Sequence, residues 1–183
     1  MKRNRVTVLS AFASALLLLG GEAQATERCS SETLRGAYAF SAAGEILGIV
    51  DGSGTVHPFE NPSILNDVAI LSFDGVGHFQ RTDFGNINGV PKGSDFNPMQ
   101  SGDYTVNSNC TGTMTIKYPS GVELDLKMVI GGGGTIVKAL VGVETVPSST
   151  PAKDKYPCDK GCRQAVQMSF DGRKVFAYHD HHE

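Results

Sequence analysis

The feature that most constrains the fold of this chain is an alternation of apolar and polar residues with a period of two. Within residues 123–130, Leu124, Leu126, Met128 and Ile130 fall on one face of an extended chain, and polar residues separate the first three of them. Alternate side chains of a strand point to opposite faces of a sheet. The segment therefore predicts a β-strand with one buried face and one face in water.

A second strand follows after a short turn. Residues 131–134 are all glycine, and residues 135–146 return with Val137, Ala139, Val141 and Val143 on the apolar face. Two such runs joined by a glycine-rich turn predict an antiparallel hairpin. Similar patterning predicts further strands over residues 34–42, 67–73, 77–84, 102–107, 111–118, 165–170 and 174–179.

The segments between these strands fall into short turns and two long connections. Asp-Gly pairs at residues 74–75 and 171–172 are typical of hairpin turns. Residues 44–66 and 147–161 are rich in turn-forming residues and fit no strand well. Eight or nine short strands with local turns predict an all-β fold, either a sandwich or an up-and-down barrel. We favour a single antiparallel barrel of about eight strands with two long loops, because closure removes exposed strand edges.

The start of the chain predicts export. Three basic residues within the first five precede an apolar run of about 15 residues, and the small residues needed for cleavage end at Ala25. The run is shorter than the roughly 20 residues that span a bilayer. We therefore expect a signal peptide over residues 1–25 and a single exported domain over residues 26–183. That domain would be periplasmic or secreted, with no membrane anchor after cleavage.

The charge of the expected mature chain argues against a nucleic-acid partner. The whole chain has 16 Lys and Arg and 19 Asp and Glu. The signal peptide removes three basic residues and one acidic residue, so the mature net charge is −5. The remaining basic residues are scattered along the chain. Nucleic-acid binding normally requires a concentrated basic face, so we expect none.

The mature chain contains four cysteines: Cys29, Cys110, Cys158 and Cys162. An even number in an exported protein favours two disulfides. Three pairings are possible. We favour Cys29–Cys110 with Cys158–Cys162, because the second pair closes a small loop. The alternative is a metal site, but the four cysteines include no C-x-x-C pair, the spacing typical of zinc.

Three motifs stand out in the mature chain: CSSETLRGAYAF, FDGVGHF and GDYTVNSNCTGTMTI. They resemble a largely uncharacterised family of exported bacterial β-barrel proteins, with the pattern G-x-Y-x-F, FDG-x-G and G-x-Y-T-V-x-x-x-C-x-G-T over roughly residues 29–143. The architecture is similar to the small barrels of the allene oxide cyclase and lipocalin type. The resemblance implies that Cys29 pairs with Cys110, and it implies no catalytic residue. The insert at 147–161 and the histidine-rich end depart from the family pattern.

Aromatic residues in the expected strands could line a ligand cavity. The candidates are Tyr38, Phe40, Phe73, Phe79 and Tyr104. The alternative is that these side chains fill the barrel, as they do in many barrels of about eight strands. Small neighbours in the 34–42 strand leave room for a cavity of modest size.

Histidines offer two further candidate sites. Three histidines lie within the last five residues: His179, His181 and His182. Together they could bind Zn²⁺, Cu²⁺ or Ni²⁺. The alternative is a solvated tail over residues 179–183. His78 could act as a general base if Asp74 or Asp83 orients it, although a place on the wet face of a strand is the simpler interpretation.

Motifs for other chemistry are missing or weak. The chain has no G-x-S-x-G nucleophile elbow. Glycines 131–134 lack the Lys-Ser/Thr of a P-loop, so they predict a turn and not a phosphate site. We therefore expect no cofactor.

These observations predict a non-catalytic exported barrel that binds a small apolar molecule or an envelope partner, with the two long loops at its mouth. The rival hypothesis is a cofactor-free isomerase or cyclase acting on an apolar substrate in the cavity. A third possibility is an interaction protein with a filled barrel. An inward Glu, Asp or His with a shifted pKa would favour the enzyme.

Overall fold

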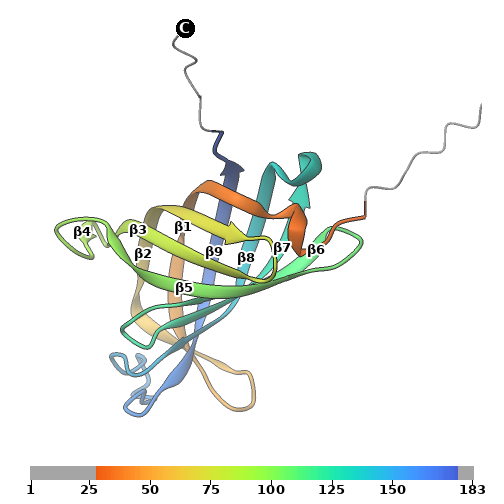
Figure 1. Cartoon of the computed structure of the whole chain (residues 1–183). Coiled ribbons are helices and arrows are strands. Elements are labelled where there is room, and N and C mark those ends of the chain that lie inside the picture. Colours follow the sequence, from red (N-terminus) through yellow and green to blue (C-terminus); the bar gives the residue numbers. More distant parts are fainter. Residues whose placement is uncertain (1–27, 177–183) are drawn as a thin grey trace, which may run out of the picture.

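The computed structural model describes residues 28–176 and shows an all-β barrel (Figure 1). Neighbouring strands follow the order β2-β1-β9-β8-β7-β6-β5-β3, and a further pairing of β2 with β3 closes the ring. All pairings are antiparallel. A two-residue strand, β4, pairs with β3 outside this ring. The predicted barrel of about eight strands is therefore confirmed.

The elements have these bounds. The strands are β1 Arg35–Val50, β2 Val56–Asp74, β3 His78–Ile87, β4 Val90–Pro91, β5 Asn97–Val106, β6 Thr111–Lys117, β7 Glu123–Gly131, β8 Ile136–Val146 and β9 Cys162–Lys174. Two short 3₁₀ turns are η1 Ser31–Thr33 and η2 Gly132–Gly134. Between residues 28 and 176, no helix is long and apolar enough to cross a membrane.

The prediction of a long loop over residues 44–66 is wrong. Residues 44–66 instead extend β1 to Val50 and start β2 at Val56, with only residues 51–55 left as a turn. The prolines that suggested a loop are accommodated by an irregular register. The pairing with β1 shifts between Pro58 and Ser63, and a bulge is a place where a strand tolerates proline.

The hairpin expected at residues 171–172 is also wrong, because β9 runs through this position without turning. Gly172 serves another purpose there. A Cβ atom at this position would lie 2.3 Å from Cζ of Phe40, so glycine allows the Phe40 ring to lie against the backbone. The expected strand at 174–179 is wrong where the structure describes it, because β9 ends at Lys174 and residues 175 and 176 are not in a strand; residues 177–179 lie outside the described residues. The Asp74-Gly75 turn is confirmed: Asp74 Oδ1 accepts backbone hydrogen bonds from the residues that follow.

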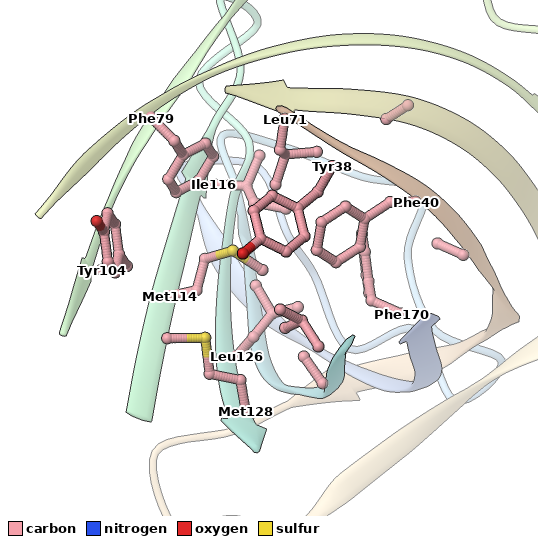
Figure 2. Packing of buried hydrophobic residues seen from close by; sticks show 14 of the residues in the cluster. Tyr38, Phe40, Leu71, Phe79, Tyr104, Met114, Ile116, Leu126, Met128 and Phe170 are labelled. Atoms are coloured by element: carbon pink, nitrogen blue, oxygen red, sulfur yellow. The ribbon is translucent and has the colours of Figure 1, made fainter. Parts of the chain in front are cut away.

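One end of the barrel is filled by aromatic side chains (Figure 2). The Phe73 ring packs edge-to-face on Tyr38 and Tyr104, with centroids 5.3 and 5.0 Å apart. The hydroxyl of Tyr104 donates to the carbonyls of Ser31 and Leu34. The N-terminal segment is thereby held across this end, which we call the closed end.

Both favoured disulfides are present. Cys29–Cys110 fastens the N-terminal segment to the turn between β5 and β6, and Cys158–Cys162 closes a short loop before β9. Two disulfides are compatible with an oxidising, exported environment. The signal peptide itself falls outside the described residues.

The second expected long connection is confirmed. Residues 147–161, here called the strap, join β8 to β9 at the end opposite the closed one. Ala152 and Cys158 of the strap are buried against Ile49 of β1 and Val146 of β8, and form a small apolar cluster of their own. This end of the barrel is therefore covered by a folded strap.

His57 joins the strap to the hairpin between β1 and β2. Its ring stacks on Tyr156, with centroids 3.9 Å apart. Its Nδ1 lies 2.7 Å from Asp154 Oδ2 and its Nε2 lies 3.2 Å from Asp51 Oδ2. The hydrogen bond with Asp154 is the largest influence on the pKa of His57, which is raised above its usual value.

Candidate functional site

A layer of polar side chains lies inside the barrel, between the aromatic end and the strap. It consists of Asp67 from β2, Arg81 and Asp83 from β3, and Gln100 from β5. All four are buried, and Arg81 is only 1% exposed. They point inward because each belongs to an inward row: Asp67 has the phase of Leu71, Arg81 and Asp83 have that of Phe79, and Gln100 has that of Tyr104.

Arg81 is the centre of this layer. Its Nη2 donates to Asp67 Oδ1 at 2.6 Å, and its Nη1 lies 2.9 Å from Asp83 Oδ2. Nη1 also donates to Gln100 Oε1 and, at 3.2 Å, to the hydroxyl of Tyr118. Gln100 donates in turn to Asp83. The guanidinium is thus held on several sides, and its Nε is buried with no hydrogen-bond partner in the described part of the chain.

Lys92 closes the network from outside the ring of strands. Its ammonium lies 2.9 Å from both Asp67 Oδ2 and Asp83 Oδ2. The backbone turn at Asn88 and Gly89, both with positive φ, returns the chain so that the Lys92 N–H can donate to the Gly85 carbonyl. Two cations and two carboxylates are therefore matched within this network, called the Arg81 network below.

The two carboxyl groups of the Arg81 network differ in acidity. Burial raises the pKa of Asp67 to about 6, against the opposing charges of Arg81 and Lys92. Burial also opposes ionisation of Asp83. However, a hydrogen bond with Asp67 and the charges of the two cations outweigh this effect of burial, and the pKa of Asp83 falls well below its usual range. Asp83 is therefore the more firmly ionised of the pair.

Glu144 enters the barrel because β8 changes phase. Leu126 pairs with Val141 but Asp125 pairs with Val143, so Gly142 is an extra residue in β8. Such a bulge moves every later side chain to the other face. Val143 is consequently only half-buried, while Glu144 is 6% exposed. The simple alternation expected for this strand, with Val143 inward, is wrong from this point.

The carboxyl group of Glu144 forms no ion pair within residues 28–176. Its Oε2 is buried and has no hydrogen-bond partner among the same residues. Burial raises the pKa of Glu144 to about 7, and the charge of Lys92 lowers it only in part. A carboxyl group with this pKa exchanges its proton near neutral pH.

A cavity of about 160 Å³ lies between Glu144 and the Arg81 network. Its polar lining consists of Asp67, Arg81, Lys92, Tyr118, Ser120 and Glu144. Its apolar lining consists of Ile46, Leu65, Ile87, Val122, Leu124, Met168 and Phe170. Val122 also packs against the apolar cluster under the strap, so the cavity wall and the strap share a side chain. An apolar chamber with a few converging polar groups is the usual form of a small-molecule site.

Two other hollows lie nearby. One of about 210 Å³ shares Lys92, Tyr118 and Ser120 with the cavity, so the Arg81 network borders both spaces. A larger hollow of about 620 Å³ runs along β6 to β9 and includes the exposed Val129 and Leu140. It includes none of the buried ionisable residues described above. We therefore place the candidate site at the smaller cavity, and an envelope partner stays a prediction.

The five aromatic residues expected to line a cavity lie elsewhere. Tyr38, Phe40, Phe73, Phe79 and Tyr104 are each at most 4% exposed and belong to the main apolar cluster. None of them lines the cavity of about 160 Å³. Their role in ligand binding stays a prediction, whereas their role in filling the closed end is evident.

The histidine candidates are not part of this site. His78 lies on the outer face, where its Nδ1 is 2.7 Å from Asp103 Oδ1 and its side chain is 72% exposed. Its carboxylate partner is therefore neither of the two expected. The metal candidates His179, His181 and His182 lie outside the described residues. Within residues 28–176, no group of three or more His, Cys, Asp or Glu is placed to hold a metal ion.

Sequence reasoning missed most residues of this site. Arg81 and Asp83 share the phase of Phe79, and this signal was present in the sequence. The signal for Glu144 was Gly142, because an isolated glycine within a strand pattern suggests a bulge. No local pattern connects Lys92 or Tyr118 with residues on other strands.

Comparison with known proteins gives little further information. No protein-family model matches the chain, and no curated protein matches it. Among solved structures, the chain is similar to the S-type phycobiliprotein lyase CPES from Guillardia theta. Sequence identity is 8%, the TM-score is 0.43, and the match covers 83% of this chain and 97% of that chain. A likeness this distant transfers neither a ligand nor an activity.

Proposed function

We propose that this protein is an exported binding barrel whose cavity holds a small, mostly apolar molecule. The proposal depends on one observation: a largely apolar cavity contains the buried carboxyl group of Glu144, whose Oε2 has no hydrogen-bond partner among residues 28–176. An unsatisfied buried polar group costs about 1–3 kcal/mol. A ligand that satisfies it would recover part of that free energy on binding.

The size of the cavity limits the ligand. An engineered apolar cavity of about 150 Å³ binds benzene, and the cavity here measures about 160 Å³. The ligand, or the part of it that enters, is therefore of the size of one substituted ring or a short branched chain. Access is expected beside Lys92, whose side chain is 28% exposed and borders the neighbouring hollow.

Filling the cavity tests the proposal. Leu65 lines the cavity, whereas Ile64, the preceding residue of β2, is 54% exposed on the outer face. We expect Leu65→Phe to abolish binding of benzyl alcohol, followed by ligand-observed NMR, and Ile64→Phe to leave it unchanged. Native mass spectrometry of the protein from its own host would identify a co-purified ligand. Equal binding by both variants, or no binding by the unaltered protein, would refute a ligand role for the cavity.

A second function is favoured by the pKa of about 7 at Glu144. A carboxyl group that both gains and loses a proton near neutral pH can move a proton between two carbons of an apolar substrate, as a cofactor-free isomerase requires. Glu144 would take a proton from the carbon beside a carbonyl and return it at the same or a neighbouring carbon.

Deuterium exchange tests this second function. We expect an active enzyme to speed the incorporation of deuterium from D₂O into cyclohexanone, measured by NMR. Glu144→Gln should abolish the effect, and Glu45→Gln on the outer face should retain it. Exchange no faster than in buffer, or equally fast in both variants, would leave binding as the better function.

A further inference from the structure

We infer that the ligands of this cavity are small apolar amines, in which one ammonium group on a compact hydrocarbon body pairs with Glu144. This inference rests on the binding function proposed above and names its ligand class. The first argument is the balance of charge around the cavity. Arg81 and Lys92 are matched by Asp67 and Asp83, so Glu144 is left as an acid with no cation of its own.

The lining offers an ammonium group what it needs. An ammonium has three donors and no acceptor, and Glu144 supplies an acceptor oxygen that no protein group occupies. The Tyr118 ring in the same cavity already lies near two cations, Arg81 at 5.5 Å and Lys92 at 5.7 Å. The remaining lining is aliphatic, with the single aromatic ring of Phe170, and suits a hydrocarbon body.

A carboxylate ligand fits less well. It would bring a further negative charge to a cavity whose lining acids, Asp67 and Glu144, together with the adjoining Asp83 already outnumber the two cations. Among the Arg81 nitrogens, Nη1 and Nη2 already bind Asp67, Asp83, Gln100 and Tyr118, and only Nε has no partner within residues 28–176. Like charges brought together away from water repel strongly, so the balance favours a cation.

Three probes of nearly equal shape separate the possibilities: benzylamine, benzyl alcohol and benzoate. Their affinities would be measured by calorimetry on the full mature protein at about pH 6 and pH 8. Burial holds the pKa of Glu144 at about 7, while an alkyl ammonium remains charged at both pH values. We expect benzylamine to bind at least about tenfold more tightly than benzyl alcohol at the higher pH, and to weaken at the lower pH. Benzoate should bind most weakly.

The variant Glu144→Gln keeps the shape of the side chain and removes its charge. We expect it to weaken benzylamine about tenfold or more and to leave benzyl alcohol within about twofold, because pairing of buried charges is lost. The outer-face variant Glu45→Gln should change neither. If benzyl alcohol or benzoate binds as tightly as benzylamine, the amine class is wrong and the binding function stands. If none of the three binds, the binding function itself fails and the amine class falls with it.

Discussion

Replacing Glu144 by glutamine should stabilise the unliganded protein, and the gain should depend on pH. In the unfolded chain the carboxyl has its usual pKa of 4.5, whereas burial raises it to about 7 in the folded state. One pKa unit corresponds to about 1.4 kcal/mol. The difference in pKa therefore lowers the free energy of unfolding by roughly 3 kcal/mol above neutral pH.

The sign follows from the protons bound by each state. Between about pH 4.5 and 7 the folded protein keeps the proton of Glu144 while the unfolded chain has lost it. Raising the pH through this window therefore favours unfolding, and the penalty levels off once the folded-state pKa is passed. Glutamine has no proton to lose, so Glu144→Gln should escape the penalty.

Urea unfolding at about pH 4 and pH 8 measures the effect. We expect the free energy of unfolding of Glu144→Gln to exceed that of the original protein by about 3 kcal/mol at pH 8, and by less than about 1 kcal/mol at pH 4. Glu45→Gln, on the exposed outer face of β1, controls for general charge effects. An equal difference at both pH values would refute the reasoning, because it would mean that Glu144 is not desolvated in the folded state.

Three further predictions concern other parts of the barrel. Arg81→Met should lower the free energy of unfolding by about 3 kcal/mol or more in urea titrations, since it leaves two buried carboxyl groups with Lys92 as their shared countercharge; a loss below about 1 kcal/mol would contradict the buried network. Gly172→Ala should cost about 1–3 kcal/mol by the same method, because its Cβ would meet the Phe40 ring; the double variant with Phe40→Leu should recover part of the loss, and simple additivity would argue against the contact. Replacing both Cys29 and Cys110 by serine should cost roughly 4 kcal/mol for a sequence separation of 81, and an unchanged urea midpoint would show that this bridge does not restrain the unfolded chain.

The barrel could be predicted from sequence because its signal is local and repeated. Strands such as β7 alternate without interruption from Glu123 to Gly131, and each turn between neighbours carries its own residues. The incorrect predictions concern glycine and proline, which are typical of turns and loops but also occur within strands. Gly172 resembles a turn residue but makes space for a ring in a neighbouring strand, and Pro58 and Pro62 resemble loop residues but lie in a long strand with an irregular register. Only the pairing of distant strands decides between these uses.

The candidate site was harder to predict because it depends on contacts between segments that are far apart in the sequence. Asp67, Arg81 and Lys92 are separated in sequence and meet only when β2, β3 and the following turn come together. A charged residue in an alternating strand is ordinarily predicted to face the solvent. Strict alternation in β8 predicts this for Glu144, and only the bulge at Gly142 turns the side chain inward. The pairing of the cysteines, by contrast, could be predicted, since it depended on a short loop and a count of four.

The bulge at Gly142 decides which later side chains of β8 face the interior of the barrel. If β8 paired with β7 without this bulge and kept strict alternation through Gly142, Val143 would face inward and Glu144 would face the solvent. The cavity would then lose the carboxyl group of Glu144 without any substitution among the residues that line it. The presence of this acid in the cavity therefore depends on the backbone register of one strand as much as on the residue type at position 144.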